Sequence, residues 1–159
     1  MRCSALIIGG VLLLALPAQA AHRSDFETQT IRVVSNRLST RLVLDRPPKG
    51  SVNKGDTLSA TSRLSNAVNQ FGRPKGAVVG TDVWVTTVIS FTANTLRAKI
   101  RATVTLPGGT IRLAGTAVET KLDVPIVGGT GAFAGARGTT DVSIRTDDVA
   151  LVTYRLRLP

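Results

Sequence analysis

Hydrophobic and polar residues alternate with a period of two along much of the chain. The clearest stretch runs from Thr95 to Leu106, where apolar side chains at even positions alternate with threonine, arginine and lysine. Successive side chains of a β-strand point to opposite faces, so this pattern predicts a strand with one buried and one solvated face. Pro107-Gly108-Gly109 then predicts a turn into residues 110–117, which completes a hairpin.

The same alternation predicts further strands, at residues 30–36, 38–45, 57–65, 76–91, 121–127, 139–146 and 149–158. Residues 46–56 and 66–76 are rich in proline and glycine and predict loops. Eight or so sequential strands joined by short turns leave two open edges unless the sheet closes. We therefore predict an all-β fold, an eight-stranded antiparallel β-barrel, which side chains can fill or which can hold one small apolar ligand.

The first twenty residues have a different pattern. Arg2 precedes an apolar run from Leu6 to Leu16, and Ala18-Gln19-Ala20 forms a small-x-small cleavage site. We expect residues 1–20 to be a signal peptide, residues 21–29 a flexible leader and residues 30–159 the barrel domain of a secreted protein, extracellular or periplasmic. The apolar run is too short to span a bilayer, so we expect no membrane span in the mature chain.

Composition limits the chemistry and the partners. The single cysteine, Cys3, lies in the signal peptide, so disulfides and Cys/His zinc sites are excluded from the mature chain, and we expect no metal and no cofactor. The chain has 20 basic against 10 acidic residues, but the bases are scattered singly. With one tryptophan and one tyrosine, a platform for stacking bases is poorly supplied, which argues against nucleic acid as a partner.

A glycine-dense segment from Pro125 to Gly138 stands between two predicted strands. Five glycines between Gly128 and Gly138 need a conformational or close-packing reason, because glycine costs backbone entropy. The segment contains a partial dinucleotide-binding fingerprint, but that motif must open a helix, and residues 139–144 are typical of a strand. A trypsin-like start at Ile126 is excluded too, because His22 is the only histidine available as a base.

An ordered set of motifs resembles the allene oxide cyclase and dirigent protein superfamily. The motifs are Leu44-Asp45 with Pro48-Lys49-Gly50, Gly55-Asp56, Gly76 with Gly80, Leu106 to Gly109 with Ile111 to Gly115, Pro125 to Gly138, and Tyr154-Arg155-Leu156. The resemblance covers about residues 30–158. It implies an eight-stranded barrel, trimeric in plant relatives, with an apolar cavity that binds a fatty-acid epoxide or phenolic radicals. Catalysis there depends on positioning and exclusion of water.

The chain departs from that family at several positions. Plant cyclases carry a Phe-Thr-Asn motif where this chain has Ala60-Thr61-Ser62, and a cavity cysteine where it places Asp82. The structural cysteine pair of plant dirigent proteins is missing as well. The resemblance therefore predicts the fold and does not carry over the activity.

Two aspartates are candidate catalytic residues. Asp45 ends a strand before a Pro-Pro loop, where it is either a base at the barrel mouth or a turn-forming residue. Asp82 interrupts an apolar run, and there it is either a cavity group whose pKa is raised by burial or a residue facing water. The second interpretation rests on apolar residues at odd-numbered positions of the same run, which would face the core and leave Asp82 on the solvent face. These residues are Val79, Val83, Val85, Ile89 and Phe91.

Four further residues are candidate ligand contacts. Asp123 and Arg137 flank the glycine segment and would meet across a turn, as a structural ion pair or as a clamp for an acidic ligand. Trp84 and Phe133 either line a cavity or belong to the packed core.

Two functions follow from these features. The first is a secreted barrel that binds a small apolar or phenolic molecule and guides a cofactor-free cyclisation or stereoselective coupling, with a homotrimer implied by the resemblance. The alternative is a non-catalytic barrel whose basic surface binds an anionic polymer or a protein partner.

Overall fold

The protein is an all-β barrel of eight strands in the computed structural model, which describes residues 26–92, 95–118 and 122–159. The strands are β1 (Glu27–Leu44), β2 (Thr57–Asn66), β3 (Val78–Thr92), β4 (Thr95–Leu106), β5 (Gly109–Val118), β6 (Pro125–Gly131), β7 (Arg137–Thr146) and β8 (Val149–Leu158). The predicted signal peptide, residues 1–20, lies outside the described residues. Within the described residues, no helix is long and apolar enough to cross a membrane.

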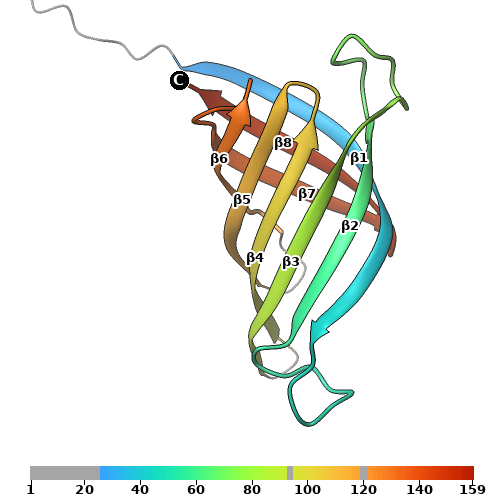
Figure 1. The fold of residues 1–159 in the computed structure, drawn as a ribbon, viewed down its shortest axis with the longest axis vertical. Coiled ribbons are helices and arrows are strands. Elements are labelled where there is room, and N and C mark those ends of the chain that lie inside the picture. The colour runs from blue at the N-terminus through green and yellow to red at the C-terminus, as the bar shows by residue number, and fades with distance from the viewer. Residues whose placement is uncertain (1–25, 93–94, 119–121) are drawn as a thin grey trace, which may run out of the picture.

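Each strand pairs antiparallel with the next, and β8 pairs with β1 to close the barrel (Figure 1). The closing ladder extends from Glu27 opposite Leu158 to Asn36 opposite Val149. The shortest ladder joins β6 to β7 through two residue pairs, Pro125 with Thr139 and Ile126 with Gly138. The predicted fold class is therefore confirmed.

The alternating pattern of β4 builds one wall of the core. From Ala98 to Leu106 its even-numbered residues are buried, and Arg97, Lys99 and Arg101 are exposed on the outer face. Other strands contribute inward residues at the same spacing. The largest side chains that are fully buried include Tyr154, Phe133, Ile31, Leu64, Ile111 and Leu113.

The first two predicted strands form one long strand. β1 runs through the predicted break at residue 37, because a register shift between Arg37 and Ser39 leaves Leu38 as an extra residue without breaking the ladder. β1 also begins at Glu27, inside the segment expected to be a flexible leader, because Arg157 and Leu158 of β8 supply ladder partners there.

β3 carries two register shifts that alter its expected parity. One lies beside Val79 and the other between Val88 and Ser90, and each moves the following side chains to the other face. Val79 is consequently buried, whereas Val83 and Val85, between the shifts, are 43% and 37% exposed on the outside. The interpretation that these two valines belong to the core is wrong.

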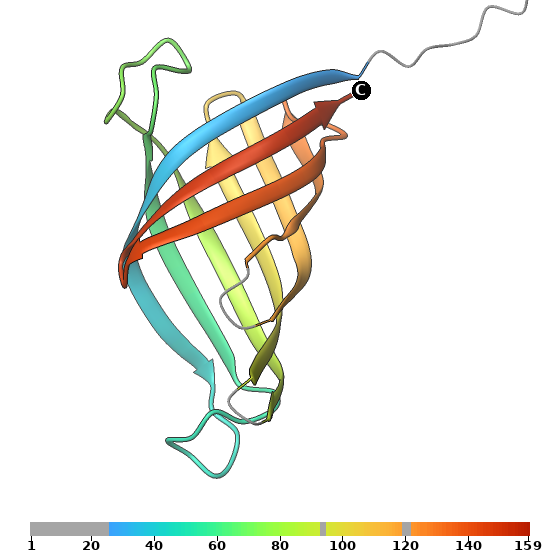
Figure 2. The same cartoon turned by 180° about the vertical axis from the view of Figure 1, so that it is seen from behind.

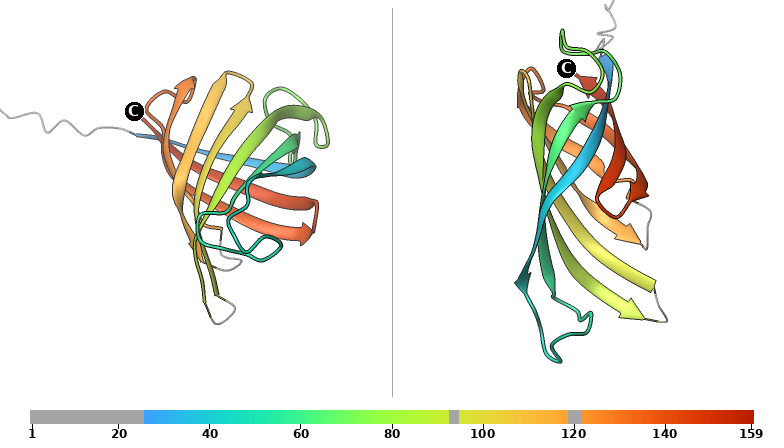
Figure 3. Two further views of the ribbon diagram at one scale, coloured as in Figure 1. Left: turned by 60° about the horizontal axis from the view of Figure 1, so that its bottom comes forward. Right: turned by 90° about the vertical axis from the view of Figure 1, so that its right-hand side faces the viewer.

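One end of the barrel is open. From residue 37 to Leu44, β1 pairs only with β2, because the β7–β8 hairpin ends opposite Asn36. Figure 2 shows β7 and β8 crossing the back of the barrel and ending well above the lower ends of β1 to β4. The left view of Figure 3, with the bottom turned forward, shows the strands around a common interior at that end.

The glycine segment forms β6, a turn and the start of β7. A Cβ atom on Gly129 would overlap the carbonyl oxygen of Phe133, and one on Gly138 would overlap the carbonyl oxygen of Arg155. Gly138 also has a φ of 147°, which disfavours other residues. The glycines thus allow a close backbone approach that places Phe133, 2% exposed, in the core.

Candidate functional site

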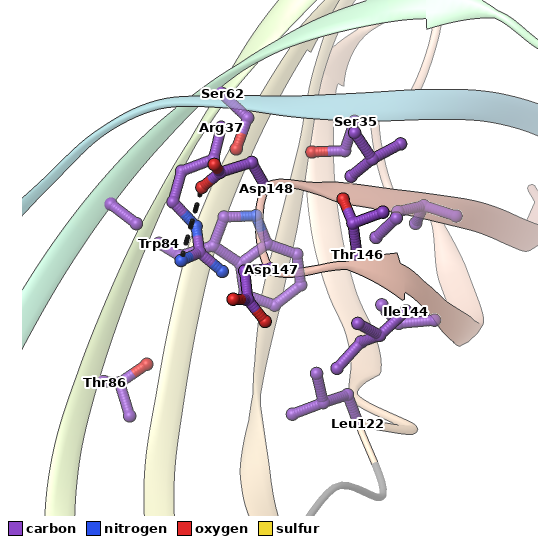
Figure 4. Close-up of a pocket in the computed structure, with 15 residues that line it drawn as sticks. Ser35, Arg37, Ser62, Trp84, Thr86, Leu122, Ile144, Thr146, Asp147 and Asp148 are labelled. Carbon is purple, nitrogen blue, oxygen red and sulfur yellow. Dashed lines mark ion pairs between the residues drawn. The ribbon is translucent and has the colours of Figure 1, made fainter.

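A cavity of about 210 Å³ lies inside the barrel near the β7–β8 hairpin and is open on one side (Figure 4). Its lining is mainly apolar, with Trp84 as the largest side chain. The other lining residues are Ser35, Arg37, Ala60, Ser62, Thr86, Leu122, Val142, Ile144, Thr146, Asp147, Asp148, Val149, Ala150 and Val152. Pockets for drug-sized ligands measure about 300–1,000 Å³, so this one suits a small ring system or one end of a longer molecule.

Asp82 is not one of the lining residues but is buried beside three of them, Ser35, Ser62 and Trp84. It is 1% exposed, and it sits opposite Ser62 of β2 in the ladder. The Ser35 hydroxyl donates to Asp82 Oδ2 at 3.4 Å, whereas Asp82 Oδ1 has no hydrogen-bond partner. Asp82 therefore points inward, behind the lining residues Ser35, Ser62 and Trp84.

Burial raises the pKa of the Asp82 carboxyl above its ordinary value, because the charged form loses hydration. Hydrogen bonds from Trp84, Ser62 and Ser35 favour the charged form but only partly offset this effect. The carboxyl group therefore keeps its proton to a higher pH than a solvated aspartate does.

Tyr154 is a second buried polar group in the same region. Burial raises the pKa of its hydroxyl well above the ordinary value, and the charge of Asp82 raises this pKa further. Tyr154 Oη has no hydrogen-bond partner, and neither has Oγ1 of Thr140, which lies opposite it in the ladder. Buried polar atoms without partners are rare, so each needs an explanation such as a bound molecule or water.

An ion pair at the cavity mouth joins β1 to the β7–β8 turn. The Arg37 guanidinium lies 3.9 Å from the Asp148 carboxylate, and the Arg37 backbone N–H donates to the Asp148 carbonyl oxygen at 2.8 Å. Asp147 occupies the same turn and lines the cavity with them (Figure 4). The hairpin is thereby held against β1 at the entrance.

The two predicted catalytic aspartates lie apart. Leu44, next to Asp45, is opposite Thr57, five residues along β2 from the partner of Asp82. At roughly 3.3 Å per residue this spacing is about 16 Å. Neither aspartate lines the cavity, but Asp82 accepts a hydrogen bond from the lining residue Ser35, whereas Asp45 is half-buried at the distant end of β1.

The predicted ligand contacts are also divided. Trp84 lines the cavity, whereas Phe133 packs in the core away from it. Arg137 donates to the carbonyl oxygens of Gly135 and Ala136. The pairing of Pro125 with Thr139 places Asp123 and Arg137 on opposite sides of that pair, which does not favour the expected meeting across a turn.

Sequence reasoning missed Ser35, Ser62 and Tyr154. A signal existed for Ser35, which shares the parity of the buried Ile31 and Val33. Polar residues on an inward parity mark an interior site, but only once the inward face is known. No group of His, Cys, Asp and Glu in the described part of the chain is arranged to hold a metal ion.

The fold is similar to that of solved barrels of the dirigent and cyclase type. One similar solved structure is pyocyanin demethylase, with a TM-score of 0.66 and 22% identity over 82% of this chain and 99% of that one. Another is the exo-specific intermolecular Diels-Alderase AbnU, with a TM-score of 0.64 and 13% identity over 83% of this chain and 98% of that one. A third is a pterocarpan synthase dirigent protein, with a TM-score of 0.58 and 19% identity over 83% of this chain and 84% of that one. The predicted resemblance to dirigent-type barrels thus holds at the level of the fold.

The sequence itself is distant from characterised proteins. No protein-family model matches it, and no curated protein matches it. The activity must therefore be argued from the cavity of this chain.

Proposed function

We propose that this barrel binds a small apolar or phenolic molecule in its cavity and guides a cofactor-free cyclisation, isomerisation or stereoselective coupling. One observation carries the proposal: the buried carboxyl group of Asp82, with one oxygen unpaired, lies behind Ser35, Ser62 and Trp84, three residues that line an open, mostly apolar cavity. Burial of a carboxyl group that keeps one oxygen unpaired is costly, which favours a role toward a ligand.

Asp82 is the proposed catalytic residue. Because burial raises its pKa, the carboxyl group holds its proton to a higher pH than a solvated aspartate does, and it can donate that proton to a bound molecule or, once ionised, accept one from it. Trp84 supplies a flat apolar surface that orients an aromatic or unsaturated ligand, and the walls exclude water from the reacting atoms. Tyr154, with its free hydroxyl group, is the second polar contact that we assign to the ligand.

The proposal also covers the location and the assembly of the protein. We propose that residues 1–20 direct secretion and that the mature protein acts outside the cytoplasm. The resemblance implies a homotrimer. The exposed Val83 and Val85 on the outside of β3 supply an apolar surface that such an assembly would cover.

The test is a binding screen of fatty acids, phenols and small aromatic molecules. Trp84 is the only tryptophan, so its fluorescence reports directly on cavity occupancy. We expect saturable quenching that Ala60→Leu or Ala150→Leu, which narrow the cavity without adding a second tryptophan, weakens strongly. Asp82→Asn should retain binding within a few-fold and lose turnover by about 10²–10⁴-fold, the range for a general acid or base.

Asp141→Asn is the matched control, because Asp141 is exposed and lies 3.8 Å from Arg155 in an ion pair. It should change neither binding nor turnover. Absence of saturable binding across the screen would refute the ligand-binding function.

The alternative function rests on the outer face of β4. Arg97, Lys99 and Arg101 are exposed there at alternate positions, and Arg112 of β5 is exposed beside them. If this surface binds an anionic polymer, retention on that polymer should fall steeply with salt and fall again in Arg97→Gln/Lys99→Gln. The cavity variants should leave this retention unchanged.

A further inference from the structure

The charges around the cavity differ in sign from those of the whole chain. The chain has 20 basic and 10 acidic residues, yet the charged residues lining the cavity are one arginine, Arg37, and two aspartates, Asp147 and Asp148. The buried Asp82 carboxyl lies behind the lining residue Ser35, which donates a hydrogen bond to it. Acidic groups are therefore concentrated at this cavity in a strongly basic protein.

The single positive charge of the lining is already compensated. Arg37 pairs with the Asp148 carboxylate at 3.9 Å, and its backbone N–H is bonded to the same residue. Asp147 has no ion-pair partner in the described part of the chain. The mouth thus retains one uncompensated negative charge, which opposes an anionic ligand.

An independent observation at Asp82 also disfavours an anionic ligand. Asp82 is 1% exposed, directs its carboxyl at the groups that line the cavity, and has Oδ1 without a partner. The unpaired oxygen Oδ1 can accept a hydrogen bond, so its complement is a ligand N–H group. The Asp147 carboxylate at the mouth and the Oδ1 atom of Asp82 therefore both favour a ligand with an N–H group that is positively polarised or charged.

Trp84 lines the cavity with Asp147 and also donates a hydrogen bond to the Asp82 carboxyl. Figure 4 shows its indole ring in the cavity together with Arg37, Asp147 and Asp148. Tryptophan is the best aromatic partner for a cation placed over its face, and the attraction grows when the pair is shielded from water. The same side chain provides a flat surface for an aromatic ring.

We infer that the ligand of this cavity is a small aromatic cation, or an aromatic molecule with a positively polarised N–H group. The inference rests on the proposed binding function and specifies its ligand class. The positive group would lie over Trp84 between Asp147 and Asp82, and the rings would contact Val142, Ile144 and Val152.

Three two-ring probes of matched shape test the inference. N-methylquinolinium carries a positive charge, 1-methylnaphthalene is its neutral counterpart, and 1-naphthoate is negative. Dissociation constants are measured by calorimetry at moderate salt, with Trp84 fluorescence as a second readout. We expect the cation to bind at least about tenfold more tightly than the neutral probe, as a shielded cation–π contact with a nearby carboxylate provides. The anion should bind most weakly.

Two variants separate the roles of the mouth residues. Asp147→Asn should weaken binding of the cation by about threefold and leave the neutral probe unchanged, in line with a partly exposed charge. Asp148→Asn releases Arg37 and should strengthen binding of the anion. Asp141→Asn, which removes an exposed carboxylate on the outer face, is the control, and thermal unfolding confirms that each variant is folded.

The outcomes distinguish the two proposals. If the neutral probe or the anion binds as tightly as the cation, the inferred ligand class is wrong, whereas the binding function stands. If none of the three probes binds, the binding function for ring-sized molecules fails and the inference fails with it. Equal loss of all probes in Asp147→Asn would also overturn the inference, because it would indicate a structural effect.

Discussion

The hydroxyl group of Tyr154 lies within electrostatic reach of the Asp82 carboxyl inside the barrel, and Tyr154 Oη and Asp82 Oδ1 both lack hydrogen-bond partners. Burial raises the pKa of both groups, and the charge of Asp82 raises the pKa of Tyr154 further. The two residues come from β8 and β3, which are not adjacent in the barrel. Their coupling therefore acts across the interior and can be measured.

The titration of Tyr154 gives the first prediction. Tyr154 is the only tyrosine, so tyrosinate absorbance reports this hydroxyl alone. A raised pKa means that the folded state favours the neutral phenol. The corresponding stability is present below about pH 10 and is lost as the pH rises through the folded pKa. We expect tyrosinate to form only well above pH 10, together with unfolding.

Asp82→Asn is the informative variant for this titration, because it removes the charge that adds to the effect of burial. Tyrosinate should form at a lower pH in the variant than in the parent protein. Identical titration curves would show that Asp82 and Tyr154 are not coupled. Asp141→Asn, on the outer face, should leave the curve unchanged.

The stability of the protein should depend on pH through Asp82. Because its folded pKa is raised, its favourable contribution is complete below the ordinary aspartate pKa, about pH 4, and declines as the pH rises through the folded pKa. The free energy of unfolding of Asp82→Asn should therefore increase relative to that of the parent as the pH rises from about 4 through the folded pKa, by about 1.4 kcal/mol for each unit of pKa shift. Urea unfolding at several pH values measures the difference, and a constant difference would contradict the shift.

Removal of the unpaired Tyr154 hydroxyl separates stability from binding. Tyr154→Phe deletes a buried polar atom that has no protein partner, so the free energy of unfolding should stay level or rise by about 1 kcal/mol. If the hydroxyl contacts the ligand, affinity should fall in the same variant. A loss of stability above about 2 kcal/mol would instead indicate a structural hydrogen bond, for example to a buried water.

The glycine segment should be intolerant of a single methyl group. Gly138→Ala would place Cβ against the carbonyl oxygen of Arg155 at a φ of 147°, and we expect a loss of about 3 kcal/mol or more. Gly50→Ala is the control. Gly50 has a φ of 80° with no atom within 4 Å of the added Cβ, so only the conformational cost of about 1 kcal/mol applies. Similar losses at both positions would contradict the close-approach role.

The fold was predictable from the sequence because its strands follow simple alternation. β4 and β8 have the bounds that the pattern predicts, and short turns between sequential strands favour closure. The errors lie where an extra residue changes the parity. Leu38 in β1 and the shifts at the ends of β3 do not break the strands, so they leave no interruption in composition to detect.

The site was less predictable for the same reason. Asp82 and Trp84 were identified, but the direction of Asp82 depended on parity within a strand that has two register shifts. Tyr154 and Ser35 come from strands that meet only when β8 closes on β1, a contact between the two ends of the chain. Asp147 and Asp148 have the composition of an ordinary turn, and only the pairing of the β7–β8 hairpin with β1 brings them to the cavity.

The outer face of β3 gives the last prediction, which concerns assembly. Val83 and Val85 are exposed between the register shifts, and Val127 of β6 is also exposed and lines the same shallow groove of the outer surface. If this surface is buried in a homotrimer, Val83→Lys/Val85→Lys should convert a trimer into a monomer in light scattering, because burying two charges without partners is costly. Thr139→Lys on β7, at the opposite side of the barrel, adds a charge without entering this surface and should leave the assembly intact. A parent protein that is monomeric at all concentrations would refute the trimer. A double variant that remains trimeric would place the interface on another face.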